Sequence, residues 1–421
     1  MHVSSPFNAA LTLPAVLSLL LPFGASVALP HLDAKMGLHA LAVQAGKKYF
    51  GSAVDNGEMN DKAYISMLGD VGQFGQITPG NTLKWQFTEP TQGHYDFTGG
   101  DIIANFAKAN RQILRCHNLI WYQQLPGFVH STSWTKETLT ALIKAHIAAE
   151  VGHYRGLCYA WDVLNEVVSD SGGYRDDVFG RVLGADVYIP LALRAAAAND
   201  PNAKLYYNDY GIEGLGTRKN ADALALVRMV RAAGAPLHGV GLQGHFLVGD
   251  VPGQAALEGV LRGFVALGVE VAFTELDVRF VQMPPSPGGL QQQAKDYGSV
   301  VGACLAVERC VGWTVWGFSD KHSWVPSTFP GMGAATLFTA DLQPKPAYDT
   351  VKRLLAAAKG RAKPPKRHQG VRRVGEAATT TTTTTTRREA QQPCREEQQR
   401  QWRRHQHGHG EREGPNAGVD C

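Results

Sequence analysis

Short apolar runs alternate with longer segments of helical character over most of this chain. The runs are brief and continuous, which is typical of strands buried on both faces of a parallel sheet. Several of the intervening segments close on glycine, as at Gly234 and Gly268. The expected strands span residues 47–54, 74–78, 112–117, 204–209, 239–245, 269–275 and 311–316, with a further strand, fourth in chain order, that ends at Glu166. The expected helices span residues 61–70, 100–109, 135–153, 186–198, 219–233, 253–267, 290–307 and 348–359.

This alternation favours an α/β fold. Strands that alternate with helices predict a parallel sheet. Eight such units in about 320 residues predict a single closed (β/α)8 TIM barrel. A doubly wound open sheet is the alternative, although no glycine-rich nucleotide-binding loop follows the first strand.

Polar side chains gather where the expected strands end. In a barrel the carboxyl ends of the strands form one rim, and active sites lie on that rim. We therefore expect a site built from His117, Asn165, Glu166, Asn208, Asp209, Gln243, His245, Glu275, Asp277 and Trp316.

Two of these strand ends carry a glutamate. They are the segments WDVLNE at 161–166 and FTELD at 273–277. A charged group is costly to bury unless it is paired or hydrogen-bonded, so a buried strand that ends in a carboxylate usually ends at a site. A single glutamate would more often be a helix cap or an ion-pair partner. Two glutamates that face one another across a cleft are the minimum equipment for cutting a glycosidic bond.

His245 and Asp277 predict a supporting chain behind Glu275. Asp277 lies two residues beyond Glu275, so both side chains point to the same side of an extended strand. An imidazole oriented by Asp277 and hydrogen-bonded to Glu275 would hold that glutamate ionised. The alternative is that His245 is only a polar residue of the rim.

The positive charge of the chain is concentrated at its end. Residues 361–421 contain 13 Lys and Arg against 7 Asp and Glu, whereas the rest contains 28 against 30. A near-neutral body gives no electrostatic case for nucleic-acid binding. Eight consecutive threonines and a Gln/Arg/His-rich run predict a Thr-rich linker and a disordered basic tail over 361–421. A misread reading frame is the alternative.

The first 28 residues predict a secretory signal peptide. Residues 9–28 are apolar and end in ASVA, which places small residues at a cleavage site. A membrane anchor is the alternative, but Pro14 and Pro22 interrupt a run that is short for a span. We therefore expect a secreted, extracellular protein with its catalytic domain over residues 29–360 and no membrane association.

The cysteines predict one disulfide. Secretion permits such bonds. Cys304 and Cys310 lie between a helix and the next strand, so we expect them to pair. Cys116 and Cys158 lie inside apolar strands and are expected to be buried thiols. The cysteines and histidines show no metal-ligand spacing.

Four motifs in combination resemble the secreted fungal endo-1,4-β-xylanases of glycoside hydrolase family 10. They are WDVLNE at 161–166, YNDY at 207–210, TELD at 274–277 and TVWGFSDKHSW at 314–324, and the resemblance covers about residues 37–357. It implies a retaining double displacement on xylan with Glu166 as acid/base and Glu275 as nucleophile. It also implies that Asn165 hydrogen-bonds the 2-hydroxyl of the sugar being cleaved.

The resemblance implies further substrate contacts. On the glycone side it implies that Lys84, His117, Trp121 and Gln243 hold the sugar, that Trp316 and Trp324 stack on or cover it, and that Asn81 and Gln124 reach the next sugar. On the leaving-group side it implies a role for Tyr210. Asn208 is also expected among the substrate-binding residues. The remaining tryptophans Trp85, Trp161 and Trp313 are expected in the core.

The chain departs from the family pattern in two places. The family usually has Pro-Glu-Asn where this chain has Pro79-Gly80-Asn81, and the missing glutamate contacts the second glycone sugar. We therefore expect weaker binding at that sugar. The family often has Trp-His-Ser-Gln where this chain has Trp121-Tyr122-Gln123-Gln124, a change expected to be peripheral.

We thus expect a monomeric hydrolase of plant cell-wall xylan that needs no cofactor. A barrel glycanase that acts on β-1,4-glucan is one alternative. A non-catalytic polysaccharide-binding protein on a hydrolase scaffold is another, and loss of either glutamate would have favoured it, but both are present.

Overall fold

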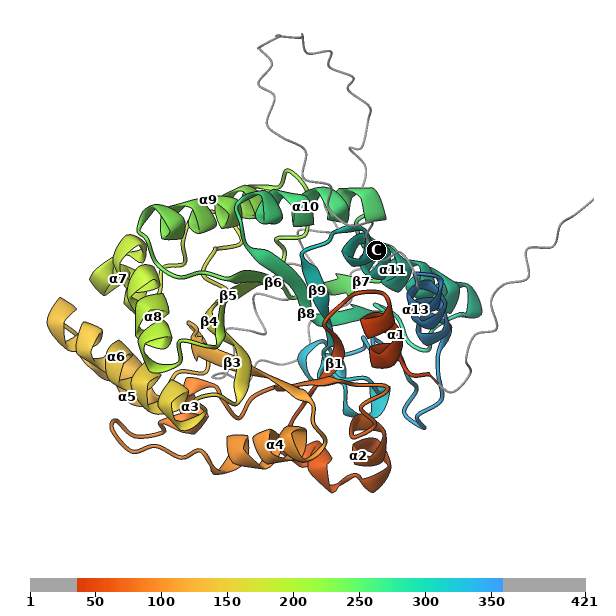
Figure 1. Ribbon diagram of the computed structural model, residues 1–421, viewed down its shortest axis with the longest axis horizontal. Coiled ribbons are helices and arrows are strands. Elements are labelled where there is room, and N and C mark those ends of the chain that lie inside the picture. The colour runs from red at the N-terminus through yellow and green to blue at the C-terminus, as the bar shows by residue number, and fades with distance from the viewer. Residues whose placement is uncertain (1–35, 359–421) are drawn as a thin grey trace, which may run out of the picture. The chain divides into compact units, whose positions relative to one another are not determined.

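Eight parallel strands close into a barrel in the computed structural model, which describes residues 36–358 (Figure 1). Closure follows from two pairings, β9 with β1 and β6 with β8. The predicted (β/α)8 barrel is therefore confirmed, and the open sheet is excluded. The barrel strands are β1 (Tyr49–Val54), β2 (Gln76–Pro79), β3 (Ile113–Ile120), β4 (Cys158–Asn165), β5 (Lys204–Asp209), β6 (Gly239–Leu242), β8 (Glu270–Arg279) and β9 (Cys310–Val315).

A ninth short strand continues the sixth barrel strand. β7 (His245–Leu247) follows β6 after Gln243 and Gly244, and it pairs only with β8. Gly244 has a φ of +76°, a backbone conformation that glycine adopts without strain. This break turns the chain at the rim and sets His245 opposite Asp277.

Helices surround the strands in Figure 1. Three of the longer ones, α6, α9 and α11, begin at capping side chains: Thr135, Thr217 and Ser286 each accept a backbone N–H of the first turn. The helices are α1 (Leu38–Gln44), α2 (Lys62–Leu68), α3 (Trp85–Thr88), α4 (Thr98–Ala109), α5 (Gly127–Ser131), α6 (Lys136–His153), α7 (Val178–Leu183), α8 (Ala185–Asn199), α9 (Arg218–Ala232), α10 (Gln254–Ala266), α11 (Pro287–Ala306), α12 (Val325–Thr328) and α13 (Pro346–Ala357), with short 3-10 turns η1 (Asn56–Asn60) and η2 (Asp320–His322).

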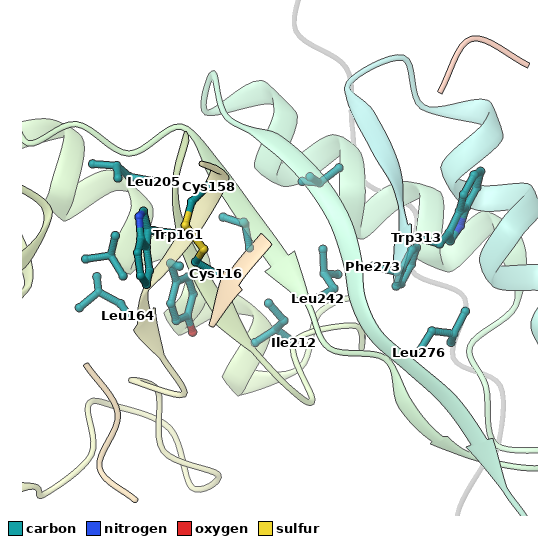
Figure 2. Packing of buried hydrophobic residues seen from close by; sticks show 14 of the residues in the cluster. Cys116, Cys158, Trp161, Leu164, Leu205, Ile212, Leu242, Phe273, Leu276 and Trp313 are labelled. Carbon is teal, nitrogen blue, oxygen red and sulfur yellow. A yellow bond between two sulfur atoms is a disulfide. The ribbon is translucent and has the colours of Figure 1, made fainter. Parts of the chain in front are cut away.

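The core lies between strands and helices, and it holds the expected tryptophans. Trp85, Trp161 and Trp313 are all buried, as predicted. Figure 2 shows Trp161 beside Leu164 and the Cys116–Cys158 bond, and Trp313 beside Phe273. Large aromatic side chains contribute most of the apolar area that such a core removes from water.

Two disulfides occur among the described residues, and one corrects the sequence interpretation. The expected pair Cys304 and Cys310 is joined, and it links the end of α11 to the start of β9. Cys116 and Cys158, expected as thiols, are also joined. Their strands β3 and β4 are neighbours in the barrel, and the two Cα atoms lie 5.8 Å apart, within bonding reach.

The predictions for both ends of the chain concern residues outside the described range. These are the signal peptide at 1–28 and the linker and tail at 361–421. Among residues 36–358, no helix has both the length and the apolar character that a membrane span requires.

Candidate active site

The rim of the barrel carries a cleft of about 810 Å³ that collects most of the predicted site residues. Its volume falls in the range of small-molecule binding sites. The predicted residues that line it are Asn81, Lys84, His117, Trp121, Gln124, Asn165, Glu166, Gln243, His245, Glu275, Trp316 and Trp324.

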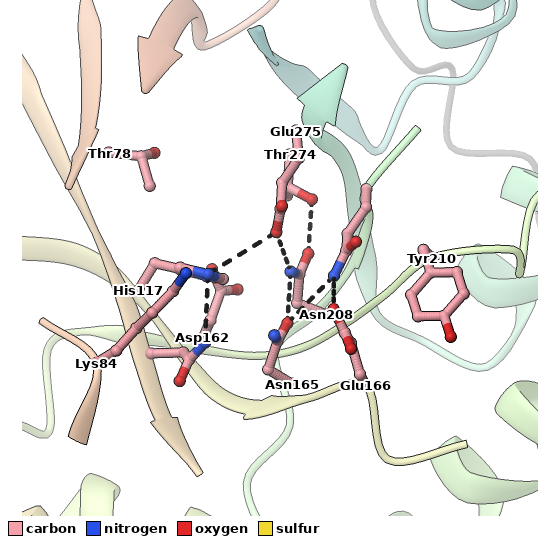
Figure 3. Close-up of polar contacts among 12 residues, drawn as sticks. Thr78, Lys84, His117, Asp162, Asn165, Glu166, Asn208, Tyr210, Thr274 and Glu275 are labelled. Carbon is pink, nitrogen blue, oxygen red and sulfur yellow. Dashed lines mark hydrogen bonds and ion pairs between the residues drawn. The ribbon is translucent and has the colours of Figure 1, made fainter. Parts of the chain in front are cut away.

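Glu166 and Glu275 enter this cleft from β4 and β8 and share one amide network. Glu166 follows the last residue of β4 with a φ of +55°, and Glu275 lies within β8. Gln243 Nε2 donates to Glu166 Oε1 at 3.0 Å, and Asn208 Nδ2 donates to Glu275 Oε1 at 2.7 Å. Both amides also reach Asn165 Oδ1, at 3.4 Å and 2.9 Å (Figure 3). The network therefore fixes the two carboxyl groups relative to each other.

The surroundings of Glu166 favour its protonated form. Only 4% of this residue is exposed. Burial raises the pKa of Glu166 above its usual value, the negative charge of Asp209 adds to this rise, and Arg175, Gln243 and Trp121 offset it only in part. Its Oε2 has no protein hydrogen-bond partner among residues 36–358. The raised pKa of Glu166 thus favours the form that can donate a proton.

The surroundings of Glu275 favour its ionised form. Burial alone would raise its pKa, but hydrogen bonds from His245 and Asn208 and the nearby imidazole of His117 hold the pKa below the usual value. His245 Nε2 lies 3.2 Å from Glu275 Oε2, and His117 Nε2 lies 4.0 Å from Oε1. The pKa values of the two glutamates are therefore shifted in opposite directions although both residues are buried in the same cleft.

His245 lies between two carboxylates. Its Nδ1 is 3.1 Å from Asp277 Oδ1, on the side opposite Glu275. Burial would lower the pKa of His245, but Asp277 and Glu275 raise it to about 10. The indole Nε1 of Trp324 donates to the other oxygen of Asp277 at 2.7 Å. A charged imidazole so placed stabilises the ionised form of Glu275.

A second set of polar residues lies at the Lys84 end of the cleft. Lys84 Nζ donates to Asn81 Oδ1 at 2.9 Å and lies 4.8 Å above the ring of Trp121. Gln124 Nε2 reaches the same Asn81 oxygen at 3.3 Å. Asn81 in turn donates to Asp55 Oδ2 at 2.7 Å. These contacts hold Asn81, Lys84 and Gln124 together at one end of the cleft.

Asp55 occupies the space next to Gly80. A Cβ atom added at Gly80 would lie 2.8 Å from Asp55 Oδ2, which is closer than real contacts allow. The absence of a side chain at Gly80 therefore leaves the space that the Asp55 carboxylate occupies. The sequence analysis did not identify Asp55, because its proximity to residues 80 and 81 arises only when β1 and β2 lie side by side.

The aromatic walls consist of half-buried tryptophans. The ring of Trp316 meets the edges of His117 and His245 at centroid distances of 5.4 Å and 6.4 Å, and Trp324 lies 5.0 Å from His245. Flat apolar faces that are partly open to the cleft suit stacking on sugar rings.

Four predicted residues lie beside the cleft instead of lining it. One of them, Asp209, is buried and pairs with Lys219 at 3.1 Å. Asn208 and Asp277 are buried, and they contact Glu275 and His245 respectively. Tyr210 lines an adjoining hollow of about 380 Å³, which shares His245 with the main cleft. Its hydroxyl accepts from Arg175 Nη2 at 2.8 Å.

The sequence analysis missed a buried group beneath the site. Asp162 Oδ2 lies 3.0 Å from His117 Nδ1 and accepts from Arg115 Nε at 3.1 Å. Thr274 Oγ1 donates to Asn208 Oδ1 at 2.6 Å, and Arg175 Nε donates to the Glu166 carbonyl at 2.6 Å. A charged residue inside an apolar strand, as Arg115 and Asp162 are, was the signal that could have revealed the pair.

Comparisons with known proteins agree with this geometry. A profile of glycosyl hydrolase family 10 matches residues 37–354. Endo-1,4-beta-xylanase 5 of Pyricularia oryzae is 51% identical over 322 residues, which cover 76% of this chain and 79% of that protein. Endo-1,4-beta-xylanase 1 of Humicola insolens is 51% identical over 320 residues, which cover 76% and 74%.

Solved structures give the same result. A xylanase of this family from a Bispora species, crystallised with xylobiose, is 40% identical with a TM-score of 0.72, and the match covers 75% of this chain and 99% of that chain. The endo-1,4-beta-xylanase XylE of Penicillium canescens is 39% identical with a TM-score of 0.74, covering 76% and 98%. The chain belongs to glycosyl hydrolase family 10.

Proposed function

We propose that this chain is an endo-1,4-β-xylanase that cuts xylan with retention of anomeric configuration. The observation that carries the mechanism is the pair of buried glutamates with opposite pKa shifts in one cleft. The substrate class is supported by relatives named endo-1,4-beta-xylanases and by the related structure that contains xylobiose.

In the first step Glu275 attacks the anomeric carbon while the bond to the leaving sugar breaks. The departing oxygen takes the proton of Glu166, because an unprotonated alkoxide is a poor leaving group. A covalent glycosyl ester on Glu275 results. The ionised state of Glu275 and the protonated state of Glu166 are the states that this step requires.

In the second step water enters where the leaving sugar was. Glu166, now ionised, takes a proton from this water, which attacks the anomeric carbon and breaks the ester to Glu275. Glu166 thereby regains its proton and Glu275 its charge. The two carboxyl groups supply acid, base and nucleophile, so this scheme involves no cofactor.

The remaining residues position the sugar and the nucleophile. Asn165 hydrogen-bonds the 2-hydroxyl, and Lys84, His117 and Gln243 hold the glycone sugar. His245 and Asp277 keep Glu275 oriented and ionised. We further propose that residues 1–28 direct secretion, that 29–360 form the catalytic domain, and that 361–421 are a linker and tail.

The test is hydrolysis of xylan by the whole secreted chain, compared with its Glu275→Ala and Glu258→Ala variants. Glu258 is a glutamate of α10 on the outside of the barrel, so it controls for loss of a carboxylate. We expect short xylo-oligosaccharides from the parent and from Glu258→Ala but none from Glu275→Ala. A parent enzyme that folds and releases nothing from xylan would refute the proposal, and faster release from cellulose would favour the β-1,4-glucan alternative.

A further inference from the structure

Two titratable side chains of α6, His146 and Glu150, are fully buried against α3 and have no part in the proposed reaction steps. His146 Nδ1 lies 3.1 Å from Glu89 Oε2, and its Nε2 lies 3.3 Å from Glu150 Oε2. One imidazole therefore faces two carboxyl groups. No lysine or arginine among residues 36–358 forms an ion pair with either of them.

A negative charge on both carboxyl groups would be costly. Glu89 is the better satisfied of the two, because Gly93 N and Trp85 Nε1 each donate to it at 2.9 Å. Glu150 accepts from Thr88 Oγ1 at 3.3 Å, and its Oε1 is buried without a hydrogen-bond partner within residues 36–358. A second buried negative charge beside Glu89 would be uncompensated. The geometry therefore favours an ionised Glu89 and a neutral Glu150.

The pKa shifts agree with this assignment. Burial raises the pKa of Glu150 well above its usual 4.5, the hydrogen bond from Thr88 offsets the rise only in part, and the charge of Glu89 adds to it. Burial lowers the pKa of His146, and Glu89 offsets this only in part. A neutral imidazole with its proton on Nδ1 donates to Glu89 and leaves Nε2 to accept the proton of Glu150.

The groups around the pair come from several elements. From β3, the backbone of Leu119 reaches the imidazole. Two tyrosines also interact with the carboxyl groups: Tyr154, at the end of α6, with Glu150, and Tyr95 with Glu89. Burial raises the pKa of both tyrosines, so they stay uncharged where the two carboxyl groups titrate.

The pair supports a helix that is too short to be stable alone. α3 has four residues, and isolated helices of this length do not persist in water. Trp85 of α3 stacks on His146, with ring centroids 3.8 Å apart and planes at 7°. Thr88 of α3 donates to Glu150, and Trp85 donates to Glu89. The buried side chains of α6 therefore form the surface on which α3 packs.

α3 in turn positions the polar residues at one end of the cleft. Lys84 is its N-cap, and the Lys84 N–H donates to the Asn81 carbonyl at 2.9 Å. The Gln86 N–H donates to the Gln124 carbonyl at 2.9 Å. Asn81, Lys84 and Gln124 line the cleft and are expected to hold the first two glycone sugars, so we call this the glycone end. A shift of α3 would move all three residues.

We propose that His146 and Glu150 are positioning residues, which hold α3 and with it the glycone end of the cleft, and that Glu150 does so as an uncharged carboxylic acid. The inference rests on the proposed function, because it assigns both residues a part in binding the glycone sugars. Opening of α3 would expose Glu150 to water, where it ionises above its ordinary pKa of 4.5. Opening thus releases a proton, so each pH unit above this value should favour opening about tenfold.

Hydrogen exchange of the peptide that contains α3 tests the state of Glu150 without any substrate. The whole chain is compared with Glu150→Gln, which keeps the shape but cannot ionise, and with Glu137→Gln, which changes an exposed glutamate of α6. From about pH 5 to about pH 8, we expect protection corrected for intrinsic exchange to fall about tenfold per pH unit in the parent and in Glu137→Gln but to stay level in Glu150→Gln. Parallel profiles for the parent and Glu150→Gln would overturn the proposal.

Two activated substrates test the positioning role. An aryl β-xylobioside places two sugars on the glycone side and an aryl β-xyloside only one, while both need Glu166 and Glu275 in the same states. We expect Glu150→Ala to lower the ratio of their kcat/KM values about tenfold, mainly through KM, because contacts to the second sugar are lost. Glu150→Gln and the control Glu137→Ala should keep the ratio of the parent.

The outcomes distinguish the possible failures. An unchanged ratio in a folded Glu150→Ala variant would overturn the proposal. An equal loss on both substrates with a lowered Tm would also overturn it, because that result indicates a purely structural role. If Glu150→Ala does not fold, the exchange profiles of the parent and Glu150→Gln still decide. A parent enzyme that cleaves neither aryl glycoside nor linear xylohexaose would instead refute the proposed function.

Discussion

At the scale of single residues, the site contains two glutamates whose pKa values burial alone would shift in the same direction. Burial raises the pKa of both, and only Glu275 has enough positive charge and hydrogen bonding to reverse the shift. Pairs of titratable groups whose surroundings separate their pKa values mark the acid and the base of a reaction. Here the separation comes mainly from His245, His117 and Asn208 around Glu275.

The pH profile follows from these two shifts. Activity requires Glu275 to be ionised, so activity should fall in acid only below the usual glutamate pKa of 4.5. Activity also requires Glu166 to be protonated, so it should persist above pH 4.5 and fall as Glu166 ionises. We expect Glu166→Gln to lower kcat on xylan about 10²- to 10⁴-fold. On an aryl xyloside with a good leaving group the loss should be smaller and the alkaline limb of the kcat/KM profile should disappear. A preserved alkaline limb in this variant would assign that limb to another group.

The positive charge of His245 contributes to the stability of the folded protein. Its folded pKa of about 10 lies above the ordinary 6.5, so the stabilisation from its charge is complete below pH 6.5 and is lost as pH rises toward 10. The free energy of unfolding of the parent should therefore fall across this interval more than that of His245→Gln. Urea titrations at several pH values measure the difference, and parallel curves for the two proteins would contradict the assignment.

Gly80 and Asp55 give a prediction about substrate affinity. An alanine at 80 would push Asp55 away and loosen Asn81, which Asp55 holds. We expect Gly80→Ala to raise KM for xylotriose about 2- to 10-fold with little change in kcat, because this factor corresponds to the loss of roughly one hydrogen bond. Gly57→Ala is the matched control, because nothing lies within 4 Å of a Cβ atom there. Equal KM values for the two variants would show that the Gly80–Asp55 fit is unimportant.

At the scale of elements, the sequence predicted strand order well and strand ends less well. β5 occupies the expected residues 204–209, because turn residues bound it on both sides. β3 and β8 continue to Ile120 and Arg279, past the expected ends, because polar residues of the rim still pair with neighbouring strands. Short helices such as α1, α3, α5, α7 and α12 were not predicted, since their stability comes from packing and not from local propensity.

The strand-to-strand disulfide should contribute more to stability than the short one. Loop-closure entropy rises with loop length, so the Cys116–Cys158 bond, with a separation of 42, should contribute about 4 kcal/mol, against about 2 kcal/mol for the separation of 6 between Cys304 and Cys310. Urea unfolding of the two double-alanine variants measures both values. The opposite order would show that local packing at α11 and β9 outweighs the entropy of the longer loop.

At the scale of the whole molecule, the barrel brings together residues far apart in the sequence. The sequence predicted the two glutamates and most of the other residues that line the cleft, because each of them closes an apolar strand or belongs to a motif. Asp55, Arg175 and the Arg115–Asp162 pair were not found, since each acts through a partner that only the closed barrel places beside it. Cys116 and Cys158 were wrongly expected to be thiols for the same reason.

The most direct test of the whole mechanism is the anomeric configuration of the first product. Proton NMR would follow xylohexaose from the moment the whole chain is added, with Glu275→Ala as the inactive control. We predict that the new reducing ends appear first as the β-anomer and then equilibrate with the α-anomer. Initial appearance of the α-anomer would contradict direct attack by Glu275 and would mean that a water molecule attacks instead.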